Sequence, residues 1–194
     1  MGGAAKSIDE VIKRGFAQLL KSEGFKKSGR NWHRSQGKDW LIVNLQASRW
    51  NLEENGKFTV NLGVFVAAVA SMAGQNAIEG KPSEPSATLR TRLGTLVYGR
   101  DHWWEVTAAS DLDLVAADLA EKMQSTGIPW LESHLDPSRL AAALKDSPSL
   151  LSFSAALLSG DRDEATRRLR EAIGLRPAAR TYFLAWASNN GISL

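Results

Sequence analysis

Uncharged polar side chains alternate with apolar ones along residues 39–65, DWLIVNLQASRWNLEENGKFTVNLGVF, and they are the first candidates for chemistry in this chain. Successive side chains of a strand point to opposite faces, so the alternation places the polar set on one side of two strands. That set comprises Asn44, Gln46, Ser48, Thr59 and Asn61. These groups can hydrogen-bond a ligand, or they can form the solvated face that antiparallel sheets commonly carry.

Tryptophans and arginines can complete a binding surface beside these strands. Trp103 and Trp104 are adjacent in an expected strand, so one ring should face inward and the other outward. An arginine next to the outward ring, at position 90 or 92, would suit a carboxylate or a phosphate. The candidate ligand-binding residues are therefore Gln46, Ser48, Asn61, Arg92, Trp104 and Arg30.

Known catalytic and cofactor motifs are missing from the sequence. There is no cysteine, which excludes disulfides, thiol nucleophiles and cysteine-based metal sites. His33, His102 and His134 lack a metal-ligand spacing. Neither a Gly-rich phosphate loop nor a Gly-x-Ser-x-Gly elbow occurs. The sequence thus predicts no metal and no cofactor, and it favours a binding protein over an enzyme.

Composition places the chain among ordinary globular proteins. Hydrophobic residues make up 43% of its 194 residues and charged residues 23%, which is typical of a chain with its own core. The longest apolar run, residues 62–70, is too short to cross a bilayer, and no secretory signal is recognisable. We therefore expect a cytoplasmic protein without a membrane-spanning segment.

Charge is distributed unevenly along the chain. Residues 1–38 carry a net charge of +6, whereas residues 101–136 carry −7. The two segments are expected to attract one another. A basic segment can also bind nucleic acid, but the compensating acidic segment disfavours that partner.

Helices are expected at both ends of the first 136 residues. Ser7 and Glu10 form a capping box for a helix that runs to about Glu23, with Gly24 following its last turn. Ser110 is expected to cap a second amphipathic helix that ends at Gly127.

Several expected strands lie between these helices. The two strands of residues 39–65 form a hairpin through the loop 49–56, and an edge strand near residues 31–34 precedes them. Residues 89–97 and 102–106 are expected to add two more strands, and a short helix is expected after Phe65. The predicted fold class is α+β, with an antiparallel sheet of about five strands.

The rest of the chain, residues 137–194, reads as a helical extension that packs on the α+β domain of residues 1–136. Helices are expected at residues 150–158, 161–175 and 178–188. The segment SGDRDEATRRLREAIGLRP, residues 159–177, resembles the second half of a tetratricopeptide repeat. No second copy occurs at the expected period, which argues against a free peptide-binding array.

Five short motifs resemble the bacterial family named domain of unknown function 4304. They are GFKKSGRNWHR, VNLQASRWN, GKFTVNLGVF, LRTRLG and WW, and the resemblance covers about residues 8–135. It implies an α+β domain with a variable carboxy-terminal extension, and it carries no activity. The family's repeated features correspond to Gly24, Phe25, Gly29, Arg30, Gln46, Ser48, Phe58, Asn61, Leu62, Gly63, Arg92, Gly94 and Trp104.

Three hypotheses follow for the polar sheet face. In the first, a non-enzymatic module, such as an immunity or accessory factor, binds a protein or a small polar ligand through Gln46, Asn61, Arg92 and an exposed Trp104. In the second, an enzyme acts on a phosphate-containing or nucleotide substrate, with Arg30, Arg90 and Arg92 as anion clamps and His33 or Glu105 transferring protons. In the third, the amides are buried and only satisfy one another. The sequence does not indicate an oligomeric state.

Overall fold

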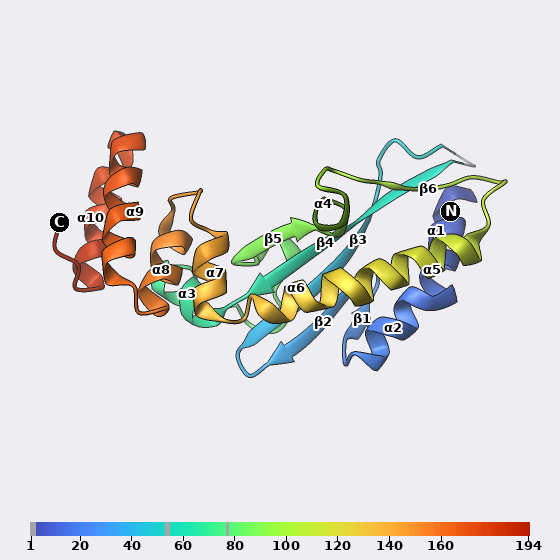
Figure 1. Cartoon of the computed structure of the whole chain (residues 1–194), viewed down its shortest axis with the longest axis horizontal. Coiled ribbons are helices and arrows are strands. Elements are labelled where there is room, and N and C mark those ends of the chain that lie inside the picture. Colours follow the sequence, from blue (N-terminus) through green and yellow to red (C-terminus); the bar gives the residue numbers. More distant parts are fainter. Residues whose placement is uncertain (1–2, 53–54, 77) are drawn as a thin grey trace.

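A six-stranded antiparallel sheet forms the centre of the molecule in the computed structural model, which describes residues 3–52, 55–76 and 78–194 (Figure 1). The strand order is β1-β2-β3-β4-β5, and β6 also pairs with β4. The strands are β1 Lys26–Ser28, β2 Asn31–Gln36, β3 Asp39–Ala47, β4 Gly56–Phe65, β5 Leu89–Arg92 and β6 Trp104–Val106. The predicted hairpin of β3 and β4 is confirmed, with Leu41 opposite Val64 and Leu45 opposite Val60. Its loop includes residues 53 and 54, which lie outside the described residues.

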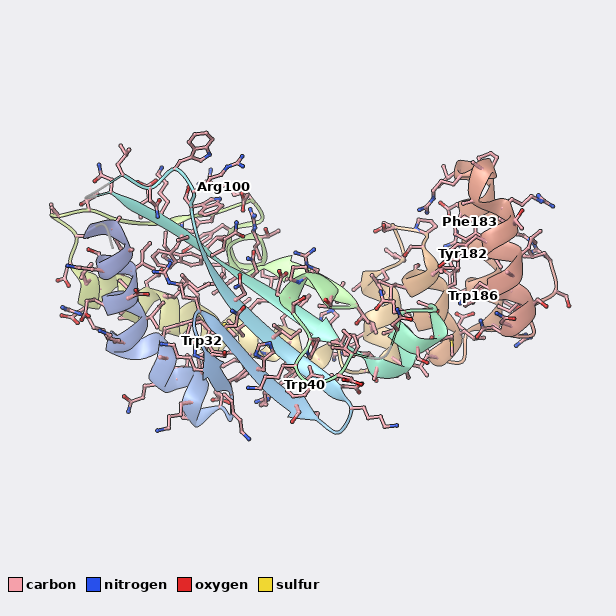
Figure 2. All side chains as sticks on the ribbon, turned by 180° about the vertical axis from the view of Figure 1, so that it is seen from behind. Trp32, Trp40, Arg100, Tyr182, Phe183 and Trp186 are labelled. Carbon is pink, nitrogen blue, oxygen red and sulfur yellow. The ribbon has the colours of Figure 1, made fainter. Side chains whose placement is uncertain are left out.

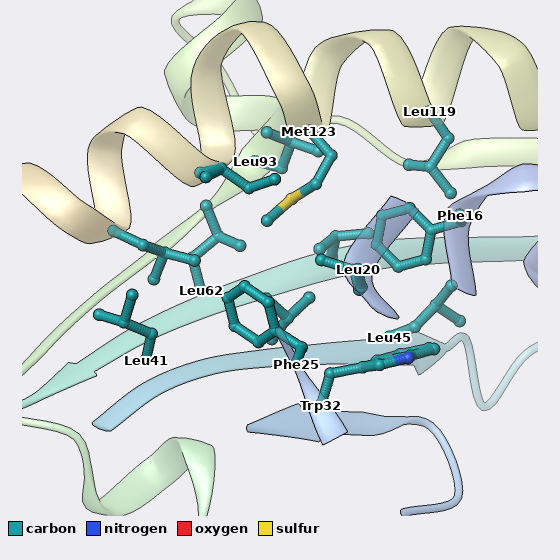
Figure 3. Packing of buried hydrophobic residues seen from close by; sticks show 14 of the residues in the cluster. Phe16, Leu20, Phe25, Trp32, Leu41, Leu45, Leu62, Leu93, Leu119 and Met123 are labelled. Atoms are coloured by element: carbon teal, nitrogen blue, oxygen red, sulfur yellow. The ribbon is translucent and has the colours of Figure 1, made fainter. Parts of the chain in front are cut away.

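Helices cover one face of this sheet. The amino-terminal pair consists of α1 Gly3–Val11 and α2 Ala17–Ser22, joined by a π-helical turn. The other pair is α5 Leu112–Lys122 and α6 Ile128–Ser133, joined in the same way. Figure 3 shows Phe16, Leu20, Leu119 and Met123 of the helices packed on apolar side chains of the strands. The apolar sets predicted for β3 and β4 all lie on this face: Leu41, Val43, Leu45, Ala47, Phe58, Val60, Leu62 and Val64.

The amino-terminal helix begins earlier than its capping box predicts. It starts at Gly3, and the Ser7 hydroxyl donates back to the Gly3 carbonyl instead of capping a helix start. Ala4, Ile8 and Val11 are buried at helical spacing, so an additional turn has an apolar stripe of its own. The predicted end is confirmed, because Gly24 adopts a φ of 81° and the Phe25 N–H donates to the Leu20 carbonyl.

Residues 89–97 are only partly a strand. After β5 the chain turns into helix α4 Leu93–Tyr98, because Leu93, Leu96 and Val97 pack on the core at helical spacing. The helix that follows the sheet is capped by the Asp111 carboxylate and not by Ser110. It also continues through Gly127, where a Cβ atom would lie 2.6 Å from the Met123 sulfur. This glycine therefore permits close packing and does not mark a helix end.

The carboxy-terminal helices continue from the sheet domain and share part of its core. They are α7 Pro137–Ala143, α8 Leu150–Leu158, α9 Arg162–Leu175 and α10 Arg180–Asn189. Leu140, Ala141 and Ala155 belong to the same buried cluster as the sheet. The short helix α3 Ala67–Met72 packs against α8, and the Trp186 indole N–H donates to the Met72 carbonyl at 2.8 Å. Figure 1 shows α9 and α10 at the end of the molecule farthest from the amino terminus.

Two ion pairs join the basic and acidic segments of the sequence. Arg14 pairs with Asp113 at 2.8 Å, and Arg34 pairs with Glu132 at 2.6 Å. The attraction between these segments is thus satisfied inside the fold. Within the described residues, no helix combines the length and the apolar character needed to traverse a bilayer.

Candidate functional site

The candidate site lies on the outer face of the sheet, defined as the face opposite α1, α2, α5 and α6. Figure 2 views the molecule from this side. Four polar residues lie directly opposite one another across four neighbouring strands: Asn31 of β2, Asn44 of β3, Asn61 of β4 and Arg92 of β5. We call these four residues the amide row.

Each member of the amide row is hydrogen-bonded to the next. Arg92 Nε donates to Asn61 Oδ1 at 3.3 Å, and Asn61 Nδ2 donates to Asn44 Oδ1 at 2.9 Å. Asn44 Nδ2 then donates to Asn31 Oδ1 at 2.8 Å. Asn61 Nδ2 makes a second bond, to Gln46 Oε1 at 3.0 Å.

Arg92 fixes the direction of this chain of hydrogen bonds. A guanidinium can only donate, so the oxygen of Asn61 must face it and the Asn61 NH₂ must face Asn44 and Gln46. Both of those residues accept through their side-chain oxygens. The NH₂ group of Asn44 in turn donates to the side-chain oxygen of Asn31. The NH₂ groups of Asn31 and Gln46 therefore point away from the row, and neither donates to any described residue. The face presents donors.

The outer face is only partly open to solvent. Gln46 is exposed, whereas Asn61 retains 7% of its accessible surface and Thr59 is fully buried. At one end of the face, a small apolar cluster of Ile42, Phe65, Ala70 and Ala87 replaces the expected wet surface. The solvated face that the polar alternation predicts is therefore confined to part of the sheet, because α3 and residues 84–88 fold back over that end.

The open end of the amide row is built by Arg92, Asp101 and Trp103. Arg92 Nη1 donates to Asp101 Oδ1 at 2.6 Å, and the Trp103 indole N–H donates to Asp101 Oδ2 at 3.1 Å. The guanidinium lies 5.3 Å from the centroid of the Trp103 ring. Donation by Arg92 and then by Trp103 lowers the pKa of Asp101 below its usual value. The Arg92 side chain remains 34% exposed.

The expectation that the two adjacent tryptophans split between the faces is confirmed, but the outward ring belongs to Trp103. Trp104 is buried in the core and stacks on Phe58, with ring centroids 6.1 Å apart. Its indole N–H donates to the Asp118 carboxylate at 2.9 Å. The exposed Trp104 of the first hypothesis is therefore wrong. The register of β6 on β4 explains why Trp104 is the inward ring, because Trp104 lies opposite the core residue Phe58.

Ser48 and Arg30 lie away from the centre of the site. Ser48 is half-buried just beyond β3, where its hydroxyl accepts from the Trp50 N–H at 3.1 Å. Arg30 lies in the turn between β1 and β2 and binds Asp9 of α1 at 2.9 Å, together with the Ala5 carbonyl. Its guanidinium is thus directed toward the helices.

The arginine clamp required by the enzyme hypothesis does not assemble. Each arginine is neutralised by its own carboxylate: Arg30 by Asp9, Arg90 by Glu84 and Arg92 by Asp101. Neighbouring strands are about 4.8 Å apart, so about 14 Å separates the backbones of Asn31 and Arg92, and Arg30 precedes Asn31.

The two proposed proton-transfer groups do not join these arginines. His33 is buried, and its Nε2 donates to the Pro82 carbonyl at 2.9 Å, while Glu105 pairs with Lys57 at 2.5 Å. Burial lowers the pKa of His33 below its usual value. In the portion of the chain with described coordinates, no three His, Asp or Glu residues gather closely enough to hold a metal ion.

Comparison with known proteins identifies one family. Residues 16–133 match the family model described as "Domain of unknown function (DUF4304)", which covers more than half of the chain and contains the amide row. That description assigns no activity. No curated protein and no solved structure gives a significant match.

Proposed function

The chain belongs to the domain of unknown function 4304 family, and we propose that it is a non-enzymatic binding module whose outer sheet face recognises hydrogen-bond acceptors. The partner is a protein segment or a small polar ligand that presents carbonyl or carboxylate oxygens. The observation that carries this proposal is the polarity of the amide row, which Arg92 sets across four strands.

The amide row and the neighbouring Gln46 offer donors that have no acceptor among the described residues. They are the NH₂ groups of Asn31 and Gln46 and the second terminal nitrogen of Arg92. An acceptor on a partner would satisfy these donors, whereas another donor would repel them. Hydrogen bonding with neighbours restricts all three side chains, so their ordering upon binding costs less conformational entropy.

The environment of Arg92 supports binding of a carboxylate or carbonyl group. Asp101 holds the guanidinium in place through one terminal nitrogen and leaves the other available. Trp103 is half-buried beside it and supplies an aromatic surface for the apolar part of a ligand. Gln46 lies on β3, two strands away from Arg92 of β5, so a partner that crosses β4 can contact both residues.

A single isosteric change tests the proposal. In Gln46→Glu, one oxygen still accepts from Asn61, but the outward donor becomes a charged acceptor. We expect affinity capture from a lysate of the source cells, quantified by mass spectrometry, to lose the wild-type partner by tenfold or more, since hydrogen bonds to charged groups contribute about 1.5–3 kcal/mol.

Gln36→Glu is the matched control, because Gln36 is an exposed glutamine at the end of β2, away from the amide row. It should capture the same partner as the wild type, and both variants should melt at the wild-type temperature. Undiminished capture by Gln46→Glu would refute recognition through the outward donors.

A further inference from the structure

A cavity lies on the outer face of the sheet, at the end opposite Arg92. Its volume is about 690 Å³, which falls within the range of small-molecule sites. Three parts of the chain line it: the start of β3 with Trp40, helix α3 with Ala67 and Ala70, and the residues Gln75, Asn76, Ile78, Gly80 and Pro82. No member of the amide row lines it, so this cavity is independent of the site described above.

The floor of the cavity is aromatic and apolar. Trp40 and Phe65 lie directly opposite each other on β3 and β4, and both line the cavity. Ala70 and Phe65 are buried in the small apolar cluster beneath it. A flat apolar group would cover surface that is otherwise in contact with water, and such burial contributes about 25 cal/mol per Å².

The walls are held in place by hydrogen bonds from outside the cavity. Asp39 accepts from the Ala67 N–H at 2.8 Å, which fixes the start of α3 against β3. His33 Nε2 donates to the Pro82 carbonyl at 2.9 Å and fixes the opposite wall. The His33 ring also packs edge-on against Trp40, with ring centroids 6.2 Å apart. The cavity is therefore preformed.

Lys38 supplies the positive charge at the rim. The other charged lining residue, Asp39, is turned toward the backbone of α3. Lys38 is exposed and makes no ion pair with a described residue. The amides of Gln75 and Asn76 and the Ser71 hydroxyl complete a polar rim around the apolar floor.

We propose that this cavity binds a small aromatic carboxylate, with the ring on Trp40 and Phe65 and the carboxylate beside Lys38. The apolar floor selects the ring. Lys38 selects an anion over a neutral or cationic group of similar size, because the one lining carboxylate, Asp39, is held against the Ala67 N–H at the start of α3 while Lys38 is exposed at the rim. A ring of six to ten atoms with one carboxylate fits well within a cavity of about 690 Å³.

Three probes of equal shape and different charge test this assignment on the full chain. Benzoate, benzamide and benzylamine are compared by saturation-transfer NMR titration. We expect benzoate to bind most tightly, and Lys38→Gln to weaken benzoate about fivefold while leaving benzamide unchanged, since an exposed charge-assisted contact contributes about 1 kcal/mol. Benzylamine binding as tightly as benzoate, or benzoate binding unaffected by Lys38→Gln, would overturn the carboxylate assignment.

The location of the site is tested by filling the cavity from its rim. Ala68 is an exposed lining residue on α3, so Ala68→Phe places a ring in the cavity without changing the core. We expect this variant to lose benzoate binding, whereas Ala143→Phe, at an exposed position on α7, should retain it. In the wild-type protein, benzoate should shift the backbone amide resonances of Ser71 and Ile78, both lining residues. Unshifted resonances there, or full binding by a folded Ala68→Phe variant, would refute the site.

Discussion

Two arginines organise polar networks in this molecule, one on the sheet and one between the carboxy-terminal helices. Arg92 is 34% exposed and leaves one terminal nitrogen without an internal acceptor. Arg168 of α9 is only 3% exposed. It donates to Glu164, to the Ala141 carbonyl and to Ser152, at 2.7 to 3.3 Å.

The two networks differ in how far their arginine is exposed to solvent. The Arg168 side chain is buried where its bonds join α7, α8 and α9, and donation by Arg167 and then by Arg168 lowers the pKa of Glu164 to about 2. The amide row is satisfied internally but ends in donors that face solvent. A buried polar network must be complete because each missing bond costs free energy, whereas an exposed one can keep donors for a partner.

The largest effect is expected at the buried Arg168 network. Arg168→Met should lower the free energy of unfolding by about 3 kcal/mol, because the Ala141 and Ser152 carbonyls lose their buried donor. Urea denaturation would measure this change. Arg170→Met, an exposed arginine on the same helix, should change stability by less than about 0.5 kcal/mol. Equal losses in the two variants would show that the network does not hold the helices together.

A smaller effect is expected at the centre of the amide row. Asn61→Ala removes the acceptor of Arg92 and the donor of Asn44 and Gln46, so we expect a loss of about 2 kcal/mol. It should also abolish partner capture. Gln46→Glu should abolish capture alone. If Asn61→Ala unfolded at the same urea concentration as the wild type, the row would not be the rigid unit described above.

His33 should make stability depend on pH. Burial lowers its pKa in the folded protein, so the unfolded chain binds a proton first as the pH falls below about 6.5. Stability is therefore complete above that pH and declines as the pH falls below it, and measurements over an interval from about pH 8 to about pH 5 would follow this decline. His33→Gln can still donate to Pro82 and should flatten this decline in thermal melts recorded across the interval. An identical pH profile for the variant would exclude His33 as the cause.

The smallest effect is expected at the exposed ion pairs. Arg14→Gln removes the pair with Asp113, in which the carboxylate side chain is 73% exposed. Such pairs contribute about 0–1 kcal/mol, so the shift in the urea midpoint should be slight and should vanish in 1 M salt. A loss as large as that of Arg168→Met would mean that the charge asymmetry of the sequence holds the fold together.

Much of the fold can be read from local patterns. The alternation in residues 39–65 correctly predicts two paired strands and their apolar face, because strand periodicity is a local property. The helices α8, α9 and α10 also begin and end close to their predicted positions, since capping residues such as Asp161 act within one turn. The helix end predicted at Gly127 is wrong, because a glycine that permits close packing cannot be told in sequence from one that ends a helix.

The candidate site was less accessible to sequence reasoning. Gln46, Asn61 and Arg92 lie on one face as predicted. The sequence leaves open which of Trp103 and Trp104 faces outward, and the choice of Trp104 is wrong. Asp101, Asn31 and the cavity beside Trp40 are not predicted. Asn31 could have been found from the hairpin register that places it opposite Asn44. Asp101 and Trp103 depend on a loop whose course is not local.

The amino-acid sequence by itself determined which side chains share a face of the sheet, because that follows from the geometry of each strand. Only the tertiary structure decided which part of the outer face stays open. Residues 84–88 and α3 return from elsewhere in the chain to cover Phe65 and Ile42, and they leave Gln46 and Arg92 uncovered. Coverage depends on contacts between segments distant in sequence, and no local period records them.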